Sequence, residues 1–468
     1  MTEIHELSAL AQSAAVASGE VSPADLVEHY LARIEAYGSG LGAFVTVTAA
    51  AARSEAAAAL PRPAHAGPLY GVPTAIKDNT ATVGVRTTFG SKAFADYVPD
   101  VDAHCAALLR RAGTISLGKT NTPEFGLSAY TDNDVAGPAV TPWDRSRNAG
   151  GSSGGAAAAV AAGLVAVAHG NDGGGSARIP ASACGVFGLK PARGRVSPGP
   201  VGFDLFGLGV QGVLARHVGD AAAYLDVMAV PMIGDANWAP PLPPGETFLD
   251  ASRREPGRLR IARYTGTSLP DVVADPACVA AWEAASEVLA GLGHDVEDIV
   301  NPFPPEVAGI FDVMWASQSL LFPVPPQSEP VLRPVSRHWR ERGRATSAEE
   351  LVNALGRLQM IARRVVESFA PYDAILTPTL ARPPQSSAWF AADGDVSVEL
   401  TRQVAFAPFA ATGNLTGMPA ASLPLHWTAD GLPIGVMLTG RPAGEAALLS
   451  LCAQVEAAHP WSHRWPPL

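Results

Sequence analysis

The sequence predicts an α/β fold in which one large domain holds a mixed, twisted β-sheet between layers of helices. Short apolar strands alternate with alanine-rich helices from Leu69 to about Val230, and this alternation is typical of layered α/β proteins. No internal repeat or low-complexity linker divides the 468 residues. The length allows two domains, but this continuity favours a single domain over residues 1–468.

Residues 1–65 predict a helical arm that packs on the outside of the core. Ser22 and Pro23 are a helix cap and first turn, and the apolar residues Leu26, Val27, Tyr30, Leu31 and Ile34 follow at helical spacing. The main core segment is expected at residues 66–230. It contains predicted strands at Val72–Ile76 and Thr114–Leu117 and predicted helices at Ala103–Ala112 and Ala156–Leu164.

The second half of the chain divides into two parts. Residues 231–371 begin with a proline-rich connection, predict a helix at Pro276–Leu292, and are expected to form a variable, substrate-facing region. Residues 372–468 return to the core with predicted strands at Tyr372–Leu376 and Ile434–Leu438.

Charge and composition exclude several classes of protein. The chain has 33 basic and 44 acidic residues without a basic run, so no nucleic-acid partner is expected. The first ten residues lack the features of a secretory signal, and the longest charge-free apolar run, Ala156–Ala168, is too short to span a bilayer. A cytoplasmic protein without membrane contact is expected. Four scattered cysteines predict buried thiols, with neither a metal nor another cofactor.

Two glycine-framed serine motifs carry the chemistry: GGSSGG at 150–155 and DGGGSARIP at 172–180. A serine hydroxyl becomes a good nucleophile when a neighbouring base removes its proton. The glycines before Ser176 lack side chains, so their N–H groups can converge on one point, as an oxyanion hole requires. Taken alone, the same residues also fit a tight turn followed by a helix cap.

Together with GVPTAIKD at 71–78, these motifs resemble the amidase signature family in order and spacing. The resemblance implies that fold, with Ser176 as the acyl-forming nucleophile. Ser152, after a cis peptide bond, is implied to relay protons between Ser176 and a basic Lys77. It further implies an oxyanion hole formed by the backbone N–H groups of Gly173, Gly174, Gly175 and Ser176. The residues implied to support the catalytic groups are Ser153, Asp172 and Arg178.

The implied activity is hydrolysis of linear carboxamides to a carboxylic acid and ammonia or an amine. A low-molecular-weight amide is the expected partner, and a homodimer is a hypothesis that one sequence does not test. Aromatic side chains are candidates for an apolar acyl pocket, although ordinary core packing is the commoner reason for such residues to be buried. These candidates are Phe125, Trp315, Phe322 and Trp389, with Phe390 beside the last.

Three alternatives compete with this interpretation. Residues 113–120 match the phosphate-loop pattern, but a predicted helix precedes them and the apolar strand falls inside the pattern. Residues 150–154 and 151–155 both match the GxSxG elbow of esterases with a histidine base such as His426 or His459. The preceding TPWDRSRNA, however, is not a hydrophobic strand. The glutamine-hydrolysing component of a tRNA-dependent amidotransferase is the third alternative. Residues 197–216 lack the SLDQIGP-like stretch associated with that glutaminase, which favours a stand-alone amidase.

Overall fold

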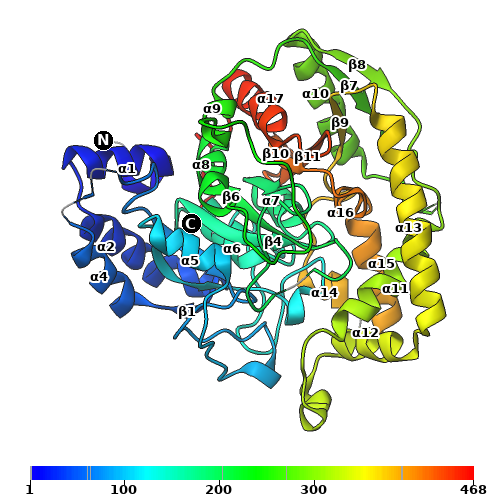
Figure 1. The fold of residues 1–468 in the computed structure, drawn as a ribbon, viewed down its shortest axis with the longest axis horizontal. Coiled ribbons are helices and arrows are strands. Elements are labelled where there is room, and N and C mark those ends of the chain that lie inside the picture. Colours follow the sequence, from blue (N-terminus) through cyan, green and yellow to red (C-terminus); the bar gives the residue numbers. More distant parts are fainter. Residues whose placement is uncertain (1–2, 61, 64, 203, 270, 392–393) are drawn as a thin grey trace.

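The computed structural model describes residues 3–60, 62–63, 65–202, 204–269, 271–391 and 394–468 (Figure 1). Within them, one eleven-stranded sheet has the order β1-β3-β2-β4-β6-β5-β10-β11-β9-β7-β8. The strands are β1 (Phe44–Val47), β2 (Pro73–Lys77), β3 (Ile115–Thr120), β4 (Val167–Asp172), β5 (Phe187–Lys190), β6 (Val210–Ala215), β7 (Arg260–Arg263), β8 (Asp295–Asp298), β9 (Ala374–Pro378), β10 (Ala420–Trp427) and β11 (Pro433–Gly440).

The sheet is mixed, as the sequence predicts. β2 runs parallel to β3 and β4, and β7 runs parallel to β8 and β9. The strands between these two groups, from β4 through β6, β5, β10 and β11 to β9, pair antiparallel. The single large sheet with flanking helices confirms the predicted α/β fold.

Helices cover the sheet and extend to both sides of it, with α13 along one flank and the N-terminal helices on the opposite flank (Figure 1). Their bounds are α1 (Ala9–Ser18), α2 (Pro23–Arg33), α3 (Ser39–Leu41), α4 (Ala49–Ala58), α5 (His104–Arg111), α6 (Gly154–Ala161), α7 (Arg178–Cys184), α8 (Val218–Met228), α9 (Phe248–Ser252), α10 (Pro276–Gly291), α11 (Val307–Ser319), α12 (Pro334–Ala345), α13 (Ala348–Phe369), α14 (Ser387–Ala391), α15 (Val396–Phe406), α16 (Thr412–Thr416) and α17 (Glu445–Ala458). Short 3₁₀ or π turns occupy Ile4–Glu6, Ile34–Gly38, Lys92–Phe94, Glu124–Gly126 and Pro326–Val331.

The predicted helices correspond to α2, α5, α6 and α10, and the predicted strands to β2, β3, β9 and β11. The N-terminal region differs from its prediction, because it is not made of helices alone. Residues 44–47 form β1, which pairs antiparallel with β3 and makes one edge of the sheet. The segment Phe-Val-Thr-Val is rich in residues that favour strands, and a neighbouring edge was available to satisfy its backbone groups.

The middle region contributes to two places. β7, α10 and β8 extend the sheet at its other edge, whereas α11 packs against the loop that follows β4. All four cysteines are free and buried. No helix among the described residues is long and apolar enough to cross a membrane.

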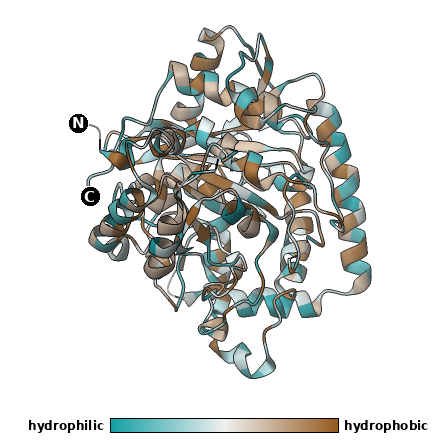
Figure 2. Cartoon of the chain, turned by 60° about the vertical axis from the view of Figure 1, so that its left-hand side comes forward, coloured by the Kyte–Doolittle hydropathy of each residue, from teal (hydrophilic) through white to brown (hydrophobic). Residues whose placement is uncertain are grey.

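The centre of the molecule is built from small residues. Every residue of α6 is fully or almost fully buried, and five of its eight residues are alanines. Alanine side chains let a helix backbone approach a sheet closely, and a Cβ on Gly155 would come within 2.2 Å of the Asn121 backbone nitrogen. Hydrophobic residues gather around this centre, whereas the outer helices mix both kinds (Figure 2). The buried helix α6 therefore fixes the place of Ser152 and Ser153, which immediately precede it.

Candidate active site

The candidate site lies where β2 and β4 end. These neighbouring strands are parallel, with Thr74 opposite Val167 and Ala75 opposite Ala168. Their carboxyl ends therefore meet at one edge of the sheet, where ligand sites of α/β proteins commonly form. Lys77 is the last residue of β2, and Asp172 is the last residue of β4.

Lys77 and Ser152 are in direct contact. Lys77 Nζ lies 2.7 Å from Ser152 Oγ, and both residues are buried. Burial disfavours the charged amine and lowers the pKa of Lys77 well below its usual value, although the negative charge of Asp172 opposes this shift. The peptide bond between Gly151 and Ser152 is cis. A buried amine with a lowered pKa beside a hydroxyl is a suitable arrangement for a general base.

Asp172 and Arg178 form an ion pair that is completely buried. Arg178 donates from Nε to Asp172 Oδ2 at 2.9 Å and from Nη2 to Oδ1 at 2.8 Å. Burial alone would raise the pKa of Asp172, but the Arg178 guanidinium holds that pKa below its usual range. The same carboxylate accepts from the N–H groups of Gly175 and Ala177, so it ties both ends of the turn around Ser176.

This arrangement corrects one part of the predicted oxyanion hole. The N–H of Gly175 donates to Asp172 Oδ1 at 2.8 Å, so this donor is already engaged within the protein. A Cβ on this residue would also lie only 2.4 Å from that of Ala410. The N–H groups of Gly173, Gly174 and Ser176 remain as candidate donors. The glycine at 175 serves the turn instead, because its φ of 127° is one that residues with a side chain rarely adopt.

Ser153 holds the two serine loops together. Its backbone N–H donates to the carbonyl oxygen of Ser176 at 3.0 Å, and its hydroxyl donates to the carbonyl oxygen of Asn171 at 3.2 Å. Ser176 itself is 6% exposed. The structure therefore brings the three predicted catalytic residues and their predicted supporting residues into one region.

Two asparagines of the site were missed by sequence reasoning. Lys77 Nζ donates to Asn171 Oδ1 at 2.6 Å, and Asn171 Nδ2 donates to Asn79 Oδ1 at 2.8 Å. Asn171 directly precedes Asp172, and Asn79 follows Lys77 by two positions. Their closeness to the motifs was the available signal, because nothing in an isolated asparagine indicates which group it bonds.

The aromatic pocket candidates separate into two groups. Phe125 and Phe322 stack with ring centroids 4.5 Å apart, and the Trp315 ring packs against Gly173 while its Nε1 donates to the Leu127 carbonyl oxygen. These three belong to one hydrophobic cluster. Trp389 packs in a different cluster, beside Phe390 and Tyr130. The structure therefore places three of the four candidates together and the fourth apart.

A model of the Amidase family matches residues 25–449. The chain belongs to this family. It is 39% identical to AmiB2 of Mycobacterium tuberculosis, and the alignment covers 99% of both chains. It is 35% identical to the 6-aminohexanoate-cyclic-dimer hydrolase of Paenarthrobacter ureafaciens, over 98% of this chain and 96% of the relative.

Solved structures of amidases agree with the fold. The structure of 6-aminohexanoate cyclic dimer hydrolase complexed with substrate superimposes with a TM-score of 0.89 at 33% identity, covering 99% of each chain. A bacterial aryl acylamidase of the amidase signature family gives a TM-score of 0.87 at 27% identity and covers both chains completely. The predicted family resemblance is confirmed.

The alternative motifs fail on structural grounds. Residues 115–120 of the phosphate-loop pattern are strand β3, and the buried Lys119 donates to Thr80, Thr82 and Thr87 within its own fold. No strand of the described chain covers residues 141–149, so the esterase elbow lacks its preceding strand. Among the described residues, Lys77 is hydrogen-bonded to the Ser152 hydroxyl, and no histidine is.

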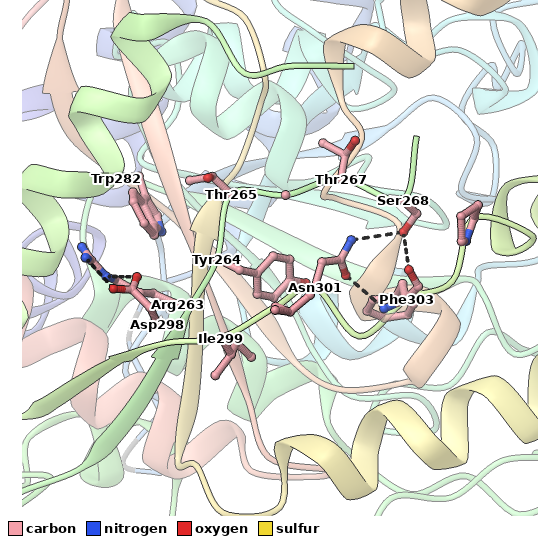
Figure 3. Close-up of a pocket in the computed structure, with 13 residues that line it drawn as sticks. Arg263, Tyr264, Thr265, Thr267, Ser268, Trp282, Asp298, Ile299, Asn301 and Phe303 are labelled. Atoms are coloured by element: carbon pink, nitrogen blue, oxygen red, sulfur yellow. Dashed lines mark hydrogen bonds and ion pairs between the residues drawn. The ribbon is translucent and has the colours of Figure 1, made fainter. Parts of the chain in front are cut away.

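A separate cavity of about 400 Å³ lies at the carboxyl ends of β7 and β8 (Figure 3). Tyr264, Trp282 and Asn301 are among the residues that line it, and Asn301 Nδ2 donates to Ser268 Oγ at 3.3 Å. Its described lining includes none of the three candidate catalytic residues. No group of three or more acidic, histidine or cysteine side chains placed to hold a metal occurs in the described residues.

Proposed function

We propose that this member of the Amidase family hydrolyses linear carboxamides to a carboxylic acid and ammonia or an amine through an acyl-enzyme on Ser176. The observation that carries the proposal is the 2.7 Å contact between the buried Lys77 Nζ and Ser152 Oγ. A lysine whose pKa is lowered by burial can be neutral at physiological pH and accept a proton. The amide-cleaving relatives support the same chemistry.

Acylation begins when Ser176 Oγ attacks the amide carbonyl carbon. Ser152 takes the Ser176 proton while its own proton passes to neutral Lys77, which becomes an ammonium. The carbonyl oxygen gains the negative charge and is stabilised by the N–H groups of Gly173, Gly174 and Ser176. One such donor typically contributes about 10²- to 10³-fold to the rate.

The tetrahedral intermediate then collapses by breaking the C–N bond. The Lys77 ammonium returns its proton through Ser152 to the departing nitrogen, so ammonia or an amine leaves and Ser176 carries the acyl group as an ester. A water molecule next attacks this ester and gives its proton to the same relay. Release of the acid restores the Ser176 hydroxyl and neutral Lys77.

The acyl group is proposed to lie against an apolar wall made by Phe125, Phe322 and Trp315. A Cβ added to Gly126 would lie 3.2 Å from Ser152 Oγ, so the backbone at Gly126 is close to this hydroxyl. Phe125 directly precedes Gly126, which places this end of the apolar wall near the reacting groups. Trp315 packs on Gly173 of the oxyanion loop. This placement favours amides with apolar or aromatic acyl groups over strongly polar ones.

The test is release of acid and ammonia or amine from aliphatic amides, aryl amides, anilides and glutamine. Wild type is compared with Lys77→Ala and Ser176→Ala, and Lys92→Ala is the control because Lys92 is an exposed lysine outside the site. Turnover of the simple amides that is lost in the first two variants and kept in the control supports the proposal. Turnover that survives in Lys77→Ala contradicts it, and glutamine as the single good substrate indicates an amidotransferase-type glutaminase instead.

A further inference from the structure

A pair of asparagines extends the chain of hydrogen bonds beyond Lys77. Lys77 Nζ contacts Ser152 Oγ at 2.7 Å on one side and Asn171 Oδ1 at 2.6 Å on the other. Asn171 in turn donates from Nδ2 to Asn79 Oδ1 at 2.8 Å. Lys77 is fully buried, whereas both asparagines are half-buried.

A neutral lysine amine has one lone pair and two N–H bonds. It acts as a base toward Ser152 when the lone pair points at the Ser152 hydroxyl. An acceptor on another side of the nitrogen fixes that orientation by accepting a hydrogen bond from one of the N–H groups. Asn171 Oδ1 is such an acceptor at hydrogen-bond distance.

We propose that Asn171 is the positioning residue of the catalytic base. Its side-chain oxygen accepts a hydrogen bond from one N–H of neutral Lys77 and thereby directs the lone pair of the amine to Ser152. Asn79 keeps the Asn171 amide in the required orientation. The inference rests on the proposed amide hydrolysis and adds residues to it.

The amide is suited to this role because it accepts a hydrogen bond without carrying a charge. A carboxylate at the same place would favour the ammonium form and raise the pKa of the base. A flipped Asn171 amide would set its NH₂ group against a Lys77 N–H and its oxygen against Asn79 Oδ1. The bond to Asn79 opposes this flip.

Other titratable groups near Lys77 are already engaged. Asp172 is paired with Arg178, and burial lowers the pKa of His169 to about 3, so this imidazole is neutral. His169 accepts from the Lys77 backbone N–H and contacts Gln211, away from the amine. The described neighbours therefore leave Asn171 as the side-chain acceptor that balances Ser152.

The experiment measures kcat, KM and the pH dependence of kcat/KM for Asn171→Asp, Asn171→Ala and Asn79→Ala on an amide that the wild type cleaves. Gln211→Glu is the matched control. Gln211 lies opposite Asn171 on β6 and contacts His169, so the variant adds a similar charge without touching the Lys77 amine. Thermal unfolding of each variant verifies the fold.

In Asn171→Asp, the rising limb of kcat/KM is expected to move to higher pH by about one to three units, with activity recovering at alkaline pH. The control is expected to shift clearly less. Asn171→Ala is expected to lower kcat by about 10- to 100-fold with little change in KM. Asn79→Ala is expected to lower kcat in the same way but less, because Asn171 keeps its oxygen and loses only its orientation.

An unshifted pH profile in Asn171→Asp together with nearly normal kcat in Asn171→Ala overturns the inference. A rise in KM alone also overturns it, because Asn171 is then a substrate contact. These outcomes are distinguishable from failure of the proposed function, in which Lys77→Ala or Ser176→Ala itself retains turnover.

Discussion

The Gly175 N–H donates to Asp172 Oδ1 at 2.8 Å, so the turn that presents Ser176 is tied to the same carboxylate that binds Arg178. Asn414 reaches this carboxylate from α16 as well, with Nδ2 at 2.9 Å from Oδ1. Asp172 is therefore a junction between the loop, helix α7 and the C-terminal part of the chain. Its charge is satisfied entirely by protein groups.

The first prediction concerns this junction. Asp172→Asn leaves Arg178 buried without a countercharge, which is expected to lower the free energy of unfolding by about 3–5 kcal/mol. The native pKa of Asp172 lies below its unfolded value of about 3.9, so its contribution is complete above that pH and is lost as the pH falls through the native pKa. The difference from wild type in denaturant unfolding is expected to be largest at neutral pH and smaller near pH 3.

The control for this prediction is Asp295→Asn, which breaks an exposed pair with Arg258. Exposed ion pairs contribute little, so its unfolding curve is expected to stay close to that of wild type. Equal effects of the two substitutions would contradict the junction role of Asp172.

The second prediction separates activity from stability at Lys77. Lys77→Met keeps most of the length of the side chain but removes the base, so turnover is expected to fall by about 10²- to 10⁴-fold. Thermal stability at pH 7 is expected to rise, because burial of the amine no longer costs free energy.

The sign follows from the lowered native pKa of Lys77. Unfolding of wild type takes up a proton at pH values between the native pKa and the unfolded value of about 10.4, and this penalty to the native state fades as the pH approaches the unfolded value. The stability gain of Lys77→Met is therefore expected to shrink at high pH. Lys92→Met, at an exposed lysine, is expected to change neither property, and a destabilised Lys77→Met protein would disprove this account.

The sequence motifs located the base and the serines because their glycines and order are distinctive within short segments. They did not reveal Asn171 as a partner of Lys77, since that contact depends on the pairing of β2 with β4 across 94 positions. They also did not reveal that the Gly175 N–H is engaged. Four successive N–H groups look equivalent in a sequence, and only the orientation of the Asp172 carboxylate distinguishes them.

The same reason explains the other differences. β1 is a strand because the β3 edge lies beside it, although its neighbours are helical. Trp389 and Phe322 are equivalent candidates in the sequence because both are aromatic, but in the structure they pack in different hydrophobic clusters. Local patterns therefore predicted the elements and the reacting groups, and the contacts between distant segments required the structure.

The third prediction concerns Gly126, which has a φ of +70°. A Cβ there would lie 3.2 Å from both Asn79 Nδ2 and Ser152 Oγ, so Gly126→Ala presses on the relay. We expect kcat to fall by about 10- to 100-fold, as small displacements of reacting groups do. Gly137→Ala is a matched control, because Gly137 has a φ of +73° but nothing within 4 Å of the added Cβ.

Both glycine variants carry the same backbone strain, about 1–2 kcal/mol for a left-handed conformation. Similar losses of thermal stability with a loss of kcat confined to Gly126→Ala would therefore assign the catalytic effect to the contact. Equal losses of kcat in both variants would assign it to strain instead. Steady-state kinetics and thermal unfolding of the two proteins decide between these results.

The fourth prediction concerns the acyl wall. Phe322→Ala removes the ring that stacks on Phe125, so an aryl or long aliphatic acyl group loses apolar contact while a small acyl group loses little. The ratio of kcat/KM for large over small acyl amides is expected to fall by about 10- to 200-fold, the usual range for apolar discrimination in a pocket. Trp389→Ala is the control from the other cluster, where the ratio is expected to stay unchanged. A ratio that falls with Trp389→Ala and stays constant with Phe322→Ala would move the acyl pocket to the side of Tyr130 and Phe390, where Trp389 packs.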